Sequence, residues 1–358
     1  MLDGDAPMDS PLKASEQFIA RATPAPCAET ASLLAKLNAA GASSLARKTP
    51  QEARDWLNRM VREEALDHPP GLAEVENTTI SANGTALNVR FYRPRPLAEG
   101  PLPLLVYFHA GGYVLGDLET LDSFCRVMAH HAECIVMSVE YRLAPEHRFP
   151  VPLEDCYAAT LWAWENASFI GADAARIAVG GDSSGGTLAI ITSYLAQQRG
   201  KPEICHQFLW YPGVGSAGPS ESSEKFSKGY FLESDLVLWS MHNYLNSKEE
   251  MLDPRVQPLR ISDLSRMPPT FLMTAGFDAR RDDNAIYAQK LRDAGVPVVF
   301  ECVESTIHGF LFMLKSISVA RDAAVRSAAH ARGVFAGLSR NTPDRTKLKE
   351  GSLRGASP

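Results

Sequence analysis

The spacing of hydrophobic residues divides the chain into regions with different predicted structure. Between residues 28 and 66, two segments carry apolar side chains at helical spacing, and this pattern predicts two helices ahead of any strand. From 73 to 94 the spacing changes to alternation, in two runs around Asn83-Gly84, which is typical of an antiparallel hairpin. Beyond the hairpin, β-branched apolar runs alternate with helical segments. We therefore predict an α/β fold with a largely parallel sheet and helices on both of its faces.

Three parts of the chain depart from this alternation. Between Pro212 and Pro268, a segment rich in Gly, Ser and Pro precedes a helical pattern that starts at Ser234, and we interpret the region as an insertion over the edge of the sheet. Residues 1–15 and 339–358 are polar, rich in Gly and Pro, and without apolar periodicity. Such segments cannot offset the entropy lost on ordering, so we expect both to be disordered.

Composition argues against several classes of protein. The 358 residues, 45% of them hydrophobic, are enough to bury a large core. The net charge of −6 comes with no dense run of Lys and Arg, so the chain lacks the basic surface typical of nucleic-acid binding. No segment approaches about 18 continuous apolar residues, and the N-terminus lacks the pattern of a secretion signal. We therefore expect a soluble, cytoplasmic protein without stable membrane insertion.

The six cysteines are scattered along the chain and include no CxxC pair. They indicate neither a disulfide framework nor a zinc ribbon, and we expect reduced thiols that lie mostly in the core. No GxxxxGK[ST] or HExxH motif occurs, so the sequence indicates neither a phosphate-binding loop nor a zinc-protease site. We predict no metal and no organic cofactor.

The sequence around Ser183 carries the strongest chemical signal. The pentapeptide GDSSG at 181–185 follows the run RIAVGG, which predicts a buried strand, and leads into a predicted helix that ends at Gly200. A serine between two glycines at such a turn is typical of a nucleophile elbow, in which the glycines let strand and helix pack closely and the strained turn exposes the hydroxyl. A tight turn without chemistry is the alternative. The N-terminus of the following helix also favours a developing oxyanion.

A serine hydroxyl is a weak nucleophile unless a base removes its proton and a third group orients that base. In hydrolases with this elbow, the acid and the histidine follow in loops after later strands. Asp278 directly follows the run TFLMTAGF, and His308 comes just after the next run, VPVVFECVE. We therefore predict Ser183 as nucleophile, Asp278 as acid and His308 as base. Asp282 and Asp283 compete with Asp278, but their positions predict caps of the next helix.

A glycine-rich loop, HAGGYVLG at 109–116, follows the apolar run LPLLVYF. Backbone N–H groups of such a loop, together with the N–H of the residue after the nucleophile, form the oxyanion hole of this architecture. We predict Gly111, Gly112 and Ser184 as the donors. His109 heads the loop, and we interpret it as a structural residue whose ring bonds to loop backbone, with a role as the base as the alternative.

Five motifs, taken in their order along the chain, resemble those of the hormone-sensitive lipase-like esterases, a family of α/β hydrolases. The motifs are HAGGYVLGD, YRLAPEHRFPVPLEDC, GDSSGG, FDARRDD and HGF. The resemblance covers roughly residues 73–338. It implies the α/β-hydrolase fold, with a mostly parallel central sheet of about eight strands, helices on both faces and a helical cap. It divides the chain into a helical cap segment at 16–70 and a catalytic domain at 71–338, with the rest of the cap inserted at about 213–268.

The chain departs from this family's pattern at secondary positions. Ala110 replaces the first Gly of the HGGG motif, Ser184 replaces the usual Ala, and Ala279-Arg280 replaces Pro-Leu after the acid. None of these changes removes a predicted catalytic group. We expect the stiffer loop at Ala110 and the extra hydroxyl at Ser184 to alter substrate preference. The YRLAPE segment at 141–146 is interpreted as structural, bracing the loop under the site.

The resemblance implies a serine carboxylesterase that forms an acyl-enzyme and then hydrolyses it with water. A compact cap implies small or medium acyl esters, aryl esters or lactones among them, as the small-molecule partner of a monomer or homodimer. Aromatic residues in segments that border the expected cleft are candidates for an apolar pocket, with core packing as the alternative. These residues are Tyr113, Trp210, Tyr211, Phe226, Tyr230, Phe231 and Trp239.

Two other functions remain open at this point. An amide, formamide or carbamate hydrolase would use the same three residues, and rates on matched esters and anilides would separate the two classes. A non-catalytic ligand receptor on this fold is the more remote alternative. Gibberellin receptors resemble this family but lack the catalytic histidine, whereas His308 is present here.

Overall fold

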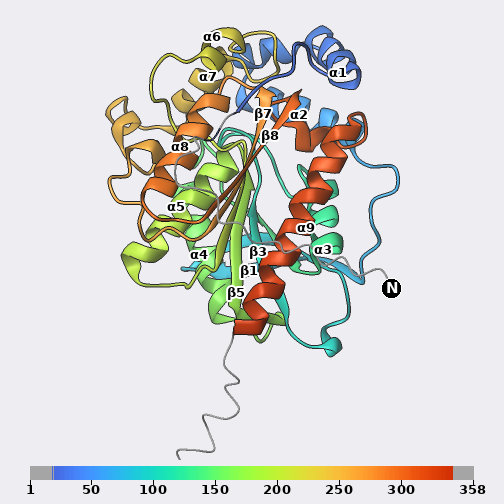
Figure 1. Cartoon of the computed structure of the whole chain (residues 1–358), viewed down its shortest axis with the longest axis vertical. Helices are drawn as coiled ribbons and strands as arrows, with labels where there is room; N and C mark the ends of the chain where they lie inside the picture. The colour runs from blue at the N-terminus through green and yellow to red at the C-terminus, as the bar shows by residue number, and fades with distance from the viewer. Residues whose placement is uncertain (1–17, 19, 342–358) are drawn as a thin grey trace, which may run out of the picture.

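The computed structural model describes residue 18 and residues 20–341 of the chain, which Figure 1 shows in full. Residues 1–15, predicted to be disordered, lie outside this described part, and so do residues 342–358 of the C-terminal tail. The tail was predicted to begin at 339, and the last helix is described as far as Asn341.

An eight-stranded sheet forms the centre of the molecule, as predicted, with the strand order β1-β2-β4-β3-β5-β6-β7-β8. The pairs β1–β2 and β2–β4 are antiparallel, and the other pairs are parallel. The predicted hairpin turns at Asn83 and Gly84, whose φ angles of 49° and 75° are the positive values that such a turn needs. The strands are β1 (Glu74–Ala82), β2 (Thr85–Arg93), β3 (Leu102–Phe108), β4 (Ile135–Glu140), β5 (Ala172–Asp182), β6 (His206–Trp210), β7 (Thr270–Phe277) and β8 (Val298–Ile307).

Helices cover both faces of this sheet (Figure 1). Helices α3 and α9 pack against each other on one face, whereas α4 and α5 pack together on the other, with α8 on the same side. The α-helices are α1 (Ala28–Ala39), α2 (Pro50–Glu64), α3 (Asp122–Ala132), α4 (Val151–Glu165), α5 (Ser184–Arg199), α6 (Glu221–Lys225), α7 (Ser234–Tyr244), α8 (Arg281–Asp293) and α9 (Ser318–Asn341). Short 3₁₀ helices are η1 (Ala42–Arg47), η2 (Leu97–Glu99), η3 (Glu249–Leu252), η4 (Pro258–Arg260) and η5 (Phe310–Met313).

Helices α1, α2, α6 and α7 gather at one end of the molecule, at the top of Figure 1. With η1, which contacts α7, we call these five elements the cap. Helix α2 is capped by Thr49: the Glu52 N–H donates to Thr49 Oγ1, and the Thr49 N–H donates to the Glu52 carboxylate. Helix α7 begins at Ser234, as predicted. Helix α6 was missed, because its five residues are too few to show apolar periodicity.

The carboxyl ends of the parallel strands face this cap. Residues that follow β3, β5, β6, β7 and β8 line one cavity together with side chains from η1, α2 and α7. In open α/β sheets, ligands bind at the carboxyl ends of the strands, because the loops that leave several strands converge there. The fold therefore brings loops that are distant in the sequence to one cavity.

Candidate active site

Ser183 lies at the turn between β5 and α5. Its backbone has φ 52° and ψ −120°, a conformation that costs a non-glycine residue about 1–3 kcal/mol unless its surroundings hold it. The Ser183 N–H donates to the Trp210 carbonyl (3.0 Å), and the Gly213 N–H donates to the Ser183 carbonyl (3.1 Å). A Cβ atom at Gly181 or Gly185 would overlap backbone atoms. Both glycines are therefore needed for the close approach of strand and helix.

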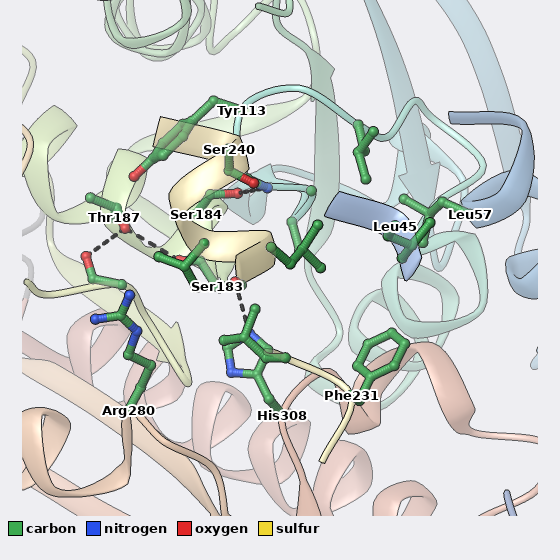
Figure 2. Close-up of a pocket in the computed structure, with 18 of the residues that line it drawn as sticks. Leu45, Leu57, Tyr113, Ser183, Ser184, Thr187, Phe231, Ser240, Arg280 and His308 are labelled. Atoms are coloured by element: carbon green, nitrogen blue, oxygen red, sulfur yellow. Dashed lines mark hydrogen bonds between the residues drawn. The ribbon is translucent and has the colours of Figure 1, made fainter. Parts of the chain in front are cut away.

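Two hydrogen bonds link Ser183 to His308 and Asp278. His308 Nε2 lies 2.8 Å from Ser183 Oγ, and His308 Nδ1 lies 2.7 Å from Asp278 Oδ2 (the Ser183–His308 bond is visible in Figure 2). With Nδ1 donating to the carboxylate, Nε2 is free to accept the serine proton. Asp278 is 1% exposed and His308 4% exposed, whereas Ser183 is half-buried at the cavity wall. The structure thus brings together the three residues that the sequence predicts as nucleophile, acid and base.

The turn after β7 orients the carboxylate of Asp278. Asp278 Oδ1 accepts the backbone N–H of Arg280 at 2.8 Å, which leaves Oδ2 for His308. The backbone carbonyl of Asp278 also accepts the N–H of Arg281 at 3.0 Å. These bonds fix the carboxylate relative to the imidazole without any contact to solvent.

Asp282 and Asp283 do not cap α8, and that prediction was wrong. The helix begins at Arg281, so both aspartates lie inside its first turn. Asp282 Oδ2 instead accepts the N–H of Ser222, and Asp283 Oδ1 accepts the N–H of Ala217, each at 2.9 Å. The two carboxylates therefore attach the inserted segment to the sheet domain, a partnership that local sequence cannot reveal.

The three predicted oxyanion donors lie beside Ser183. Among the described residues, the N–H groups of Gly111 and Ser184 have no hydrogen-bond acceptor, whereas the Gly112 N–H donates to Ser184 Oγ at 2.9 Å (Figure 2). A Cβ atom at Gly111, where φ is 130°, would overlap the carbonyl of Leu115. The loop can therefore fold this tightly only with glycine there.

Asp182 holds the glycine-rich loop against the elbow, a role that the sequence analysis missed. Its buried carboxylate accepts hydrogen bonds from the Tyr107 hydroxyl (2.7 Å), the Ala110 N–H (2.9 Å) and the Tyr211 hydroxyl (3.2 Å). Burial raises the pKa of Asp182 to about 6, and the three hydrogen bonds oppose that rise. The available signal was a carboxylate directly after the run IAVGG at the end of β5.

His109 points away from the reacting groups. Its Nδ1 donates to the Ala110 carbonyl (2.7 Å), and its ring stacks on Tyr141 with 4.4 Å between centroids. The Tyr141 hydroxyl donates to the His109 carbonyl (2.7 Å). Burial lowers the pKa of His109, which favours the neutral ring. These contacts agree with a structural residue in the loop and offer no path to a role as the base.

Arg54 joins the cap to the same loop and was also missed. From α2, its guanidinium donates to the carbonyls of Val114 and Ala144, each at 2.9 Å. It also forms two hydrogen bonds to Glu146, at 2.9 and 2.7 Å, and these lower the pKa of Glu146 to about 2. Glu146 belongs to the YRLAPE segment, which contacts the loop directly elsewhere: the Tyr141 hydroxyl donates to the His109 carbonyl, and the Ala144 N–H donates to the Tyr113 carbonyl at 2.9 Å.

The cavity above Ser183 contains about 840 Å³ of space not filled by atoms, including the open solvent at its mouth. Ser183 and His308 lie at its wall, and apolar side chains of the cap supply much of the rest, Leu45, Leu57 and Met241 among them. Arg280 adds a cation on one side (Figure 2). The cavity can therefore hold an ester with apolar substituents next to the serine hydroxyl.

Two of the seven aromatic residues proposed for the pocket, Tyr113 and Phe231, line this cavity. The other five do not line it: Trp210, Tyr211, Phe226, Tyr230 and Trp239. Trp210 and Tyr211 are fully buried in the core behind the elbow. Phe226 and Tyr230 pack on Phe277 instead. Position near the site in the sequence could not distinguish side chains that face the cavity from those that pack beneath it.

Across the residues that the structure describes, no group of three or more His, Cys, Asp or Glu side chains is arranged to hold a metal ion. In the same part of the chain, none of the helices combines the length and the apolar character needed to cross a bilayer.

Comparisons with known proteins agree with this fold. A family model described as the alpha/beta hydrolase fold matches residues 105–312. The chain is 39% identical over 254 residues to the carboxylic ester hydrolase LipN of Mycobacterium tuberculosis, a match that covers 69% of this chain and 67% of LipN. It is 35% identical over 262 residues to an arylesterase of Saccharolobus solfataricus, covering 73% of this chain and 84% of that enzyme.

Among solved structures, ester-hydrolase EH1AB1 from the metagenome of Lake Arreo, complexed with a bipyridine phosphonate derivative, superposes with a TM-score of 0.83. It is 37% identical in sequence, and the match covers 87% of this chain and 99% of that one. The chain therefore belongs to the α/β hydrolases, and within them to the hormone-sensitive lipase-like esterases, the family that its motifs resemble.

Proposed function

We propose that this protein is a serine carboxylic-ester hydrolase that cleaves small or medium acyl esters through an acyl-enzyme, with Ser183 as nucleophile. The observation that carries the proposal is the chain of two hydrogen bonds from Ser183 Oγ to His308 Nε2 and from His308 Nδ1 to Asp278 Oδ2. The named esterases among its relatives support ester hydrolysis as the reaction.

In the first half of the reaction, Ser183 Oγ bonds to the ester carbonyl carbon while its proton moves to His308 Nε2. Asp278 holds the ring in the tautomer that can accept this proton, and its charge stabilises the imidazolium. When the bond from the carbonyl carbon to the alcohol oxygen breaks, His308 returns the proton to that oxygen. Water then repeats the sequence on the acyl-enzyme and releases the acid.

Charge that develops on the carbonyl oxygen is stabilised by the N–H groups of Gly111, Gly112 and Ser184. Each such donor contributes about 10²–10³-fold to the rate in enzymes of this kind. In the free enzyme the Gly112 N–H donates to Ser184 Oγ. When the oxyanion forms, this N–H donates to the oxyanion instead, or to both acceptors at once. This mechanism uses protein groups and water at every step.

The apolar lining of the cavity supports small or medium esters, including aryl esters and lactones. Apolar cap side chains surround the position of the substituents, and the serine hydroxyl lies at the wall. An amide or carbamate hydrolase would use the same groups and is the second candidate. A receptor without catalysis is disfavoured because His308 is present and bonded to Ser183.

An acyl-length series of p-nitrophenyl esters, measured with wild type and Ser183→Ala, tests the proposal. We expect wild type to prefer short acyl chains and Ser183→Ala to lose turnover by about 10⁶-fold while it remains folded. Circular dichroism and thermal unfolding of the variant supply the folding control. Turnover retained by Ser183→Ala would reject this nucleophile, and faster cleavage of a matched p-nitroanilide than of the ester would favour the amide hydrolase.

A further inference from the structure

Arg280 places a permanent charge on a cavity wall that is otherwise largely apolar. Of the described residues that line the cavity, it is the one lysine, arginine, aspartate or glutamate. Its side chain is half-buried, so solvent screens the charge only in part. The cation therefore acts inside the volume that the substrate occupies.

The guanidinium of Arg280 forms no ion pair with any described residue, in contrast to its neighbour. Arg281 pairs with Asp282 at 2.8 Å and with Glu221 at 3.5 Å. Within the described part of the chain, the Arg280 side chain makes one hydrogen bond, a long one of 3.4 Å from Nη1 to the Gly215 carbonyl. Most of its donors therefore have no acceptor among the described residues.

The carboxylates of the same turn are engaged by other groups. Asp278 accepts His308 through one oxygen and the backbone N–H of Arg280 through the other. Asp283 accepts the N–H of Ala217, and the Arg280 charge acts on it from a distance. Neither carboxylate neutralises the guanidinium by direct pairing.

The backbone fixes where this cation lies relative to the reacting serine. Because the Arg280 N–H bonds to Asp278, the side chain starts from the same turn that holds the acid. Figure 2 shows the guanidinium directed toward Thr187, whereas Leu45, Leu57 and Phe231 lie on the far side of Ser183 and His308. The cavity thus has an apolar side and a cationic side, with the nucleophile between them.

We infer that the preferred substrates are esters that carry a carboxylate a few bonds from the scissile carbonyl, and that Arg280 selects them; this inference rests on the proposed function. A planar guanidinium with free N–H groups matches the two oxygens of a carboxylate and forms charge-assisted hydrogen bonds. A neutral ester of the same length leaves those donors unpaired inside the cavity. The ionic ester is therefore held more tightly, while the apolar side accepts the uncharged part.

Two pairs of substrates test this inference. p-Nitrophenyl hydrogen adipate and p-nitrophenyl hexanoate differ by a carboxylate at the end of the acyl chain, and 3-acetoxybenzoate and phenyl acetate differ by a carboxylate on the alcohol. For each pair the measured quantity is the ratio of kcat/KM for the anionic ester to kcat/KM for the neutral ester. Any general effect of a substitution on catalysis cancels in this ratio.

For at least one pair, we expect Arg280→Leu to lower the ratio by about tenfold, mainly through KM, as loss of a charge-assisted hydrogen bond implies. Arg280→Lys keeps the charge and should restore part of the ratio. Added salt should lower the ratio in wild type but not in Arg280→Leu. Arg260→Gln, which removes an exposed cation outside the cavity, is the control and should leave the ratio unchanged.

A fall of less than about threefold in both pairs, or an equal fall in Arg260→Gln, would overturn the inference, because a charge-assisted bond contributes more than that. Wild-type turnover of the two neutral esters, absent in Ser183→Ala, tests the proposed function separately. If the esters are turned over but the ratio is unchanged in Arg280→Leu, the role of Arg280 is rejected and the proposed esterase function stands. If none of the four esters is turned over by wild type, the proposed function is rejected.

Discussion

The floor and the cap of the cavity are held by different kinds of interaction. By the floor we mean the residues at the carboxyl ends of the strands, where buried carboxylates are fixed by directional hydrogen bonds: Asp182 accepts three and Asp278 is bonded through both oxygens. The cap contributes apolar side chains such as Leu45 and Leu57, which pack without direction. The difference indicates that the floor determines the chemistry, whereas the cap determines which groups fit.

Directional bonds also cross between the two regions: Asp282 accepts the N–H of Ser222 in α6, and Arg54 makes a second link. Arg54 of the cap reaches the carbonyls of Val114 and Ala144 and the carboxylate of Glu146. Substitutions in the floor should therefore change kcat by large factors, those at the junction should change stability and KM, and those beside the oxyanion donors should change rates slightly. Four predictions test this ranking.

The largest effect is expected for Asp278→Asn. An amide in place of the carboxylate favours the wrong tautomer of His308, and we expect kcat to fall by about 10⁴-fold with little change in KM. Steady-state kinetics on a short-chain p-nitrophenyl ester provides the measurement. Asp283→Asn alters a buried carboxylate of the same turn that bonds to Ala217 rather than to His308, and it should cost far less. Equal losses in the two variants would contradict the assignment of Asp278.

The second prediction concerns the pH dependence of stability that Asp182 causes. Burial raises the pKa of Asp182 from 3.8 to about 6 in the folded state, so between these values the folded chain holds a proton that the unfolded chain has lost. The contribution of Asp182 to the free energy of unfolding is therefore fully present below about pH 4. It declines as the pH rises through about 6, by up to about 3 kcal/mol in total.

The measurement is the free energy of unfolding in urea for wild type minus that for Asp182→Asn, followed across this pH range. The subtraction removes the opposite trend from paired carboxylates such as Glu146, whose pKa is lowered to about 2. We expect the difference to decrease as the pH rises. A difference that stays flat would mean that Asp182 titrates at its ordinary pKa and that its three hydrogen bonds compensate fully for burial.

The third prediction addresses the junction. Arg54→Ala removes hydrogen bonds to two backbone carbonyls, and we expect the free energy of unfolding to fall by about 1–3 kcal/mol. Since the loop that carries Val114 also carries Gly111 and Gly112, two of the proposed oxyanion donors, KM should rise several-fold. Glu146→Gln is the matched variant. The Glu146 carboxylate, which pairs with Arg54, has a side chain that is 55% exposed, so its loss should have the smaller effect on the free energy of unfolding. A larger loss in Glu146→Gln would assign the junction to the ion pair instead.

The smallest effect is expected for Ser184→Ala. The Gly112 N–H now donates to Ser184 Oγ, and removing that acceptor frees the donor for the oxyanion. We expect kcat/KM to rise by about threefold, in line with the net free energy of one neutral hydrogen bond. Ser240→Ala removes a hydroxyl that also lies beside Gly112 but does not bond to it, and should not produce this rise. A fall in Ser184→Ala would show that the hydroxyl positions the loop.

Much of the fold follows from local patterns. Alternation around Asn83-Gly84 predicted the β1–β2 hairpin, and the switch to buried runs and helical segments predicted the parallel sheet. The residues proposed as nucleophile, acid and base were found because each follows a predicted strand. Strand ends are recognisable in sequence, and in parallel strands they necessarily meet at one edge.

Partnerships between distant segments could not be predicted in this way. Periodicity reports that a side chain is buried, but not what it packs against. It therefore could not separate Tyr113 and Phe231, which line the cavity, from Trp210, which lies beneath it. The first-turn aspartates of α8 look like caps in the sequence, yet they bind the inserted segment.

The sequence by itself determined the order of strands and helices, the glycines that permit the turn at Ser183 and the residue types able to do the chemistry. Only the tertiary structure decided that Asp182 braces the loop, that Arg54 joins it to the cap, and that Arg280 faces the cavity without an ion-pair partner among the described residues. The reason is physical: backbone preference acts over a few neighbouring residues, whereas a hydrogen bond or an unpaired charge depends on which distant groups the fold brings within reach.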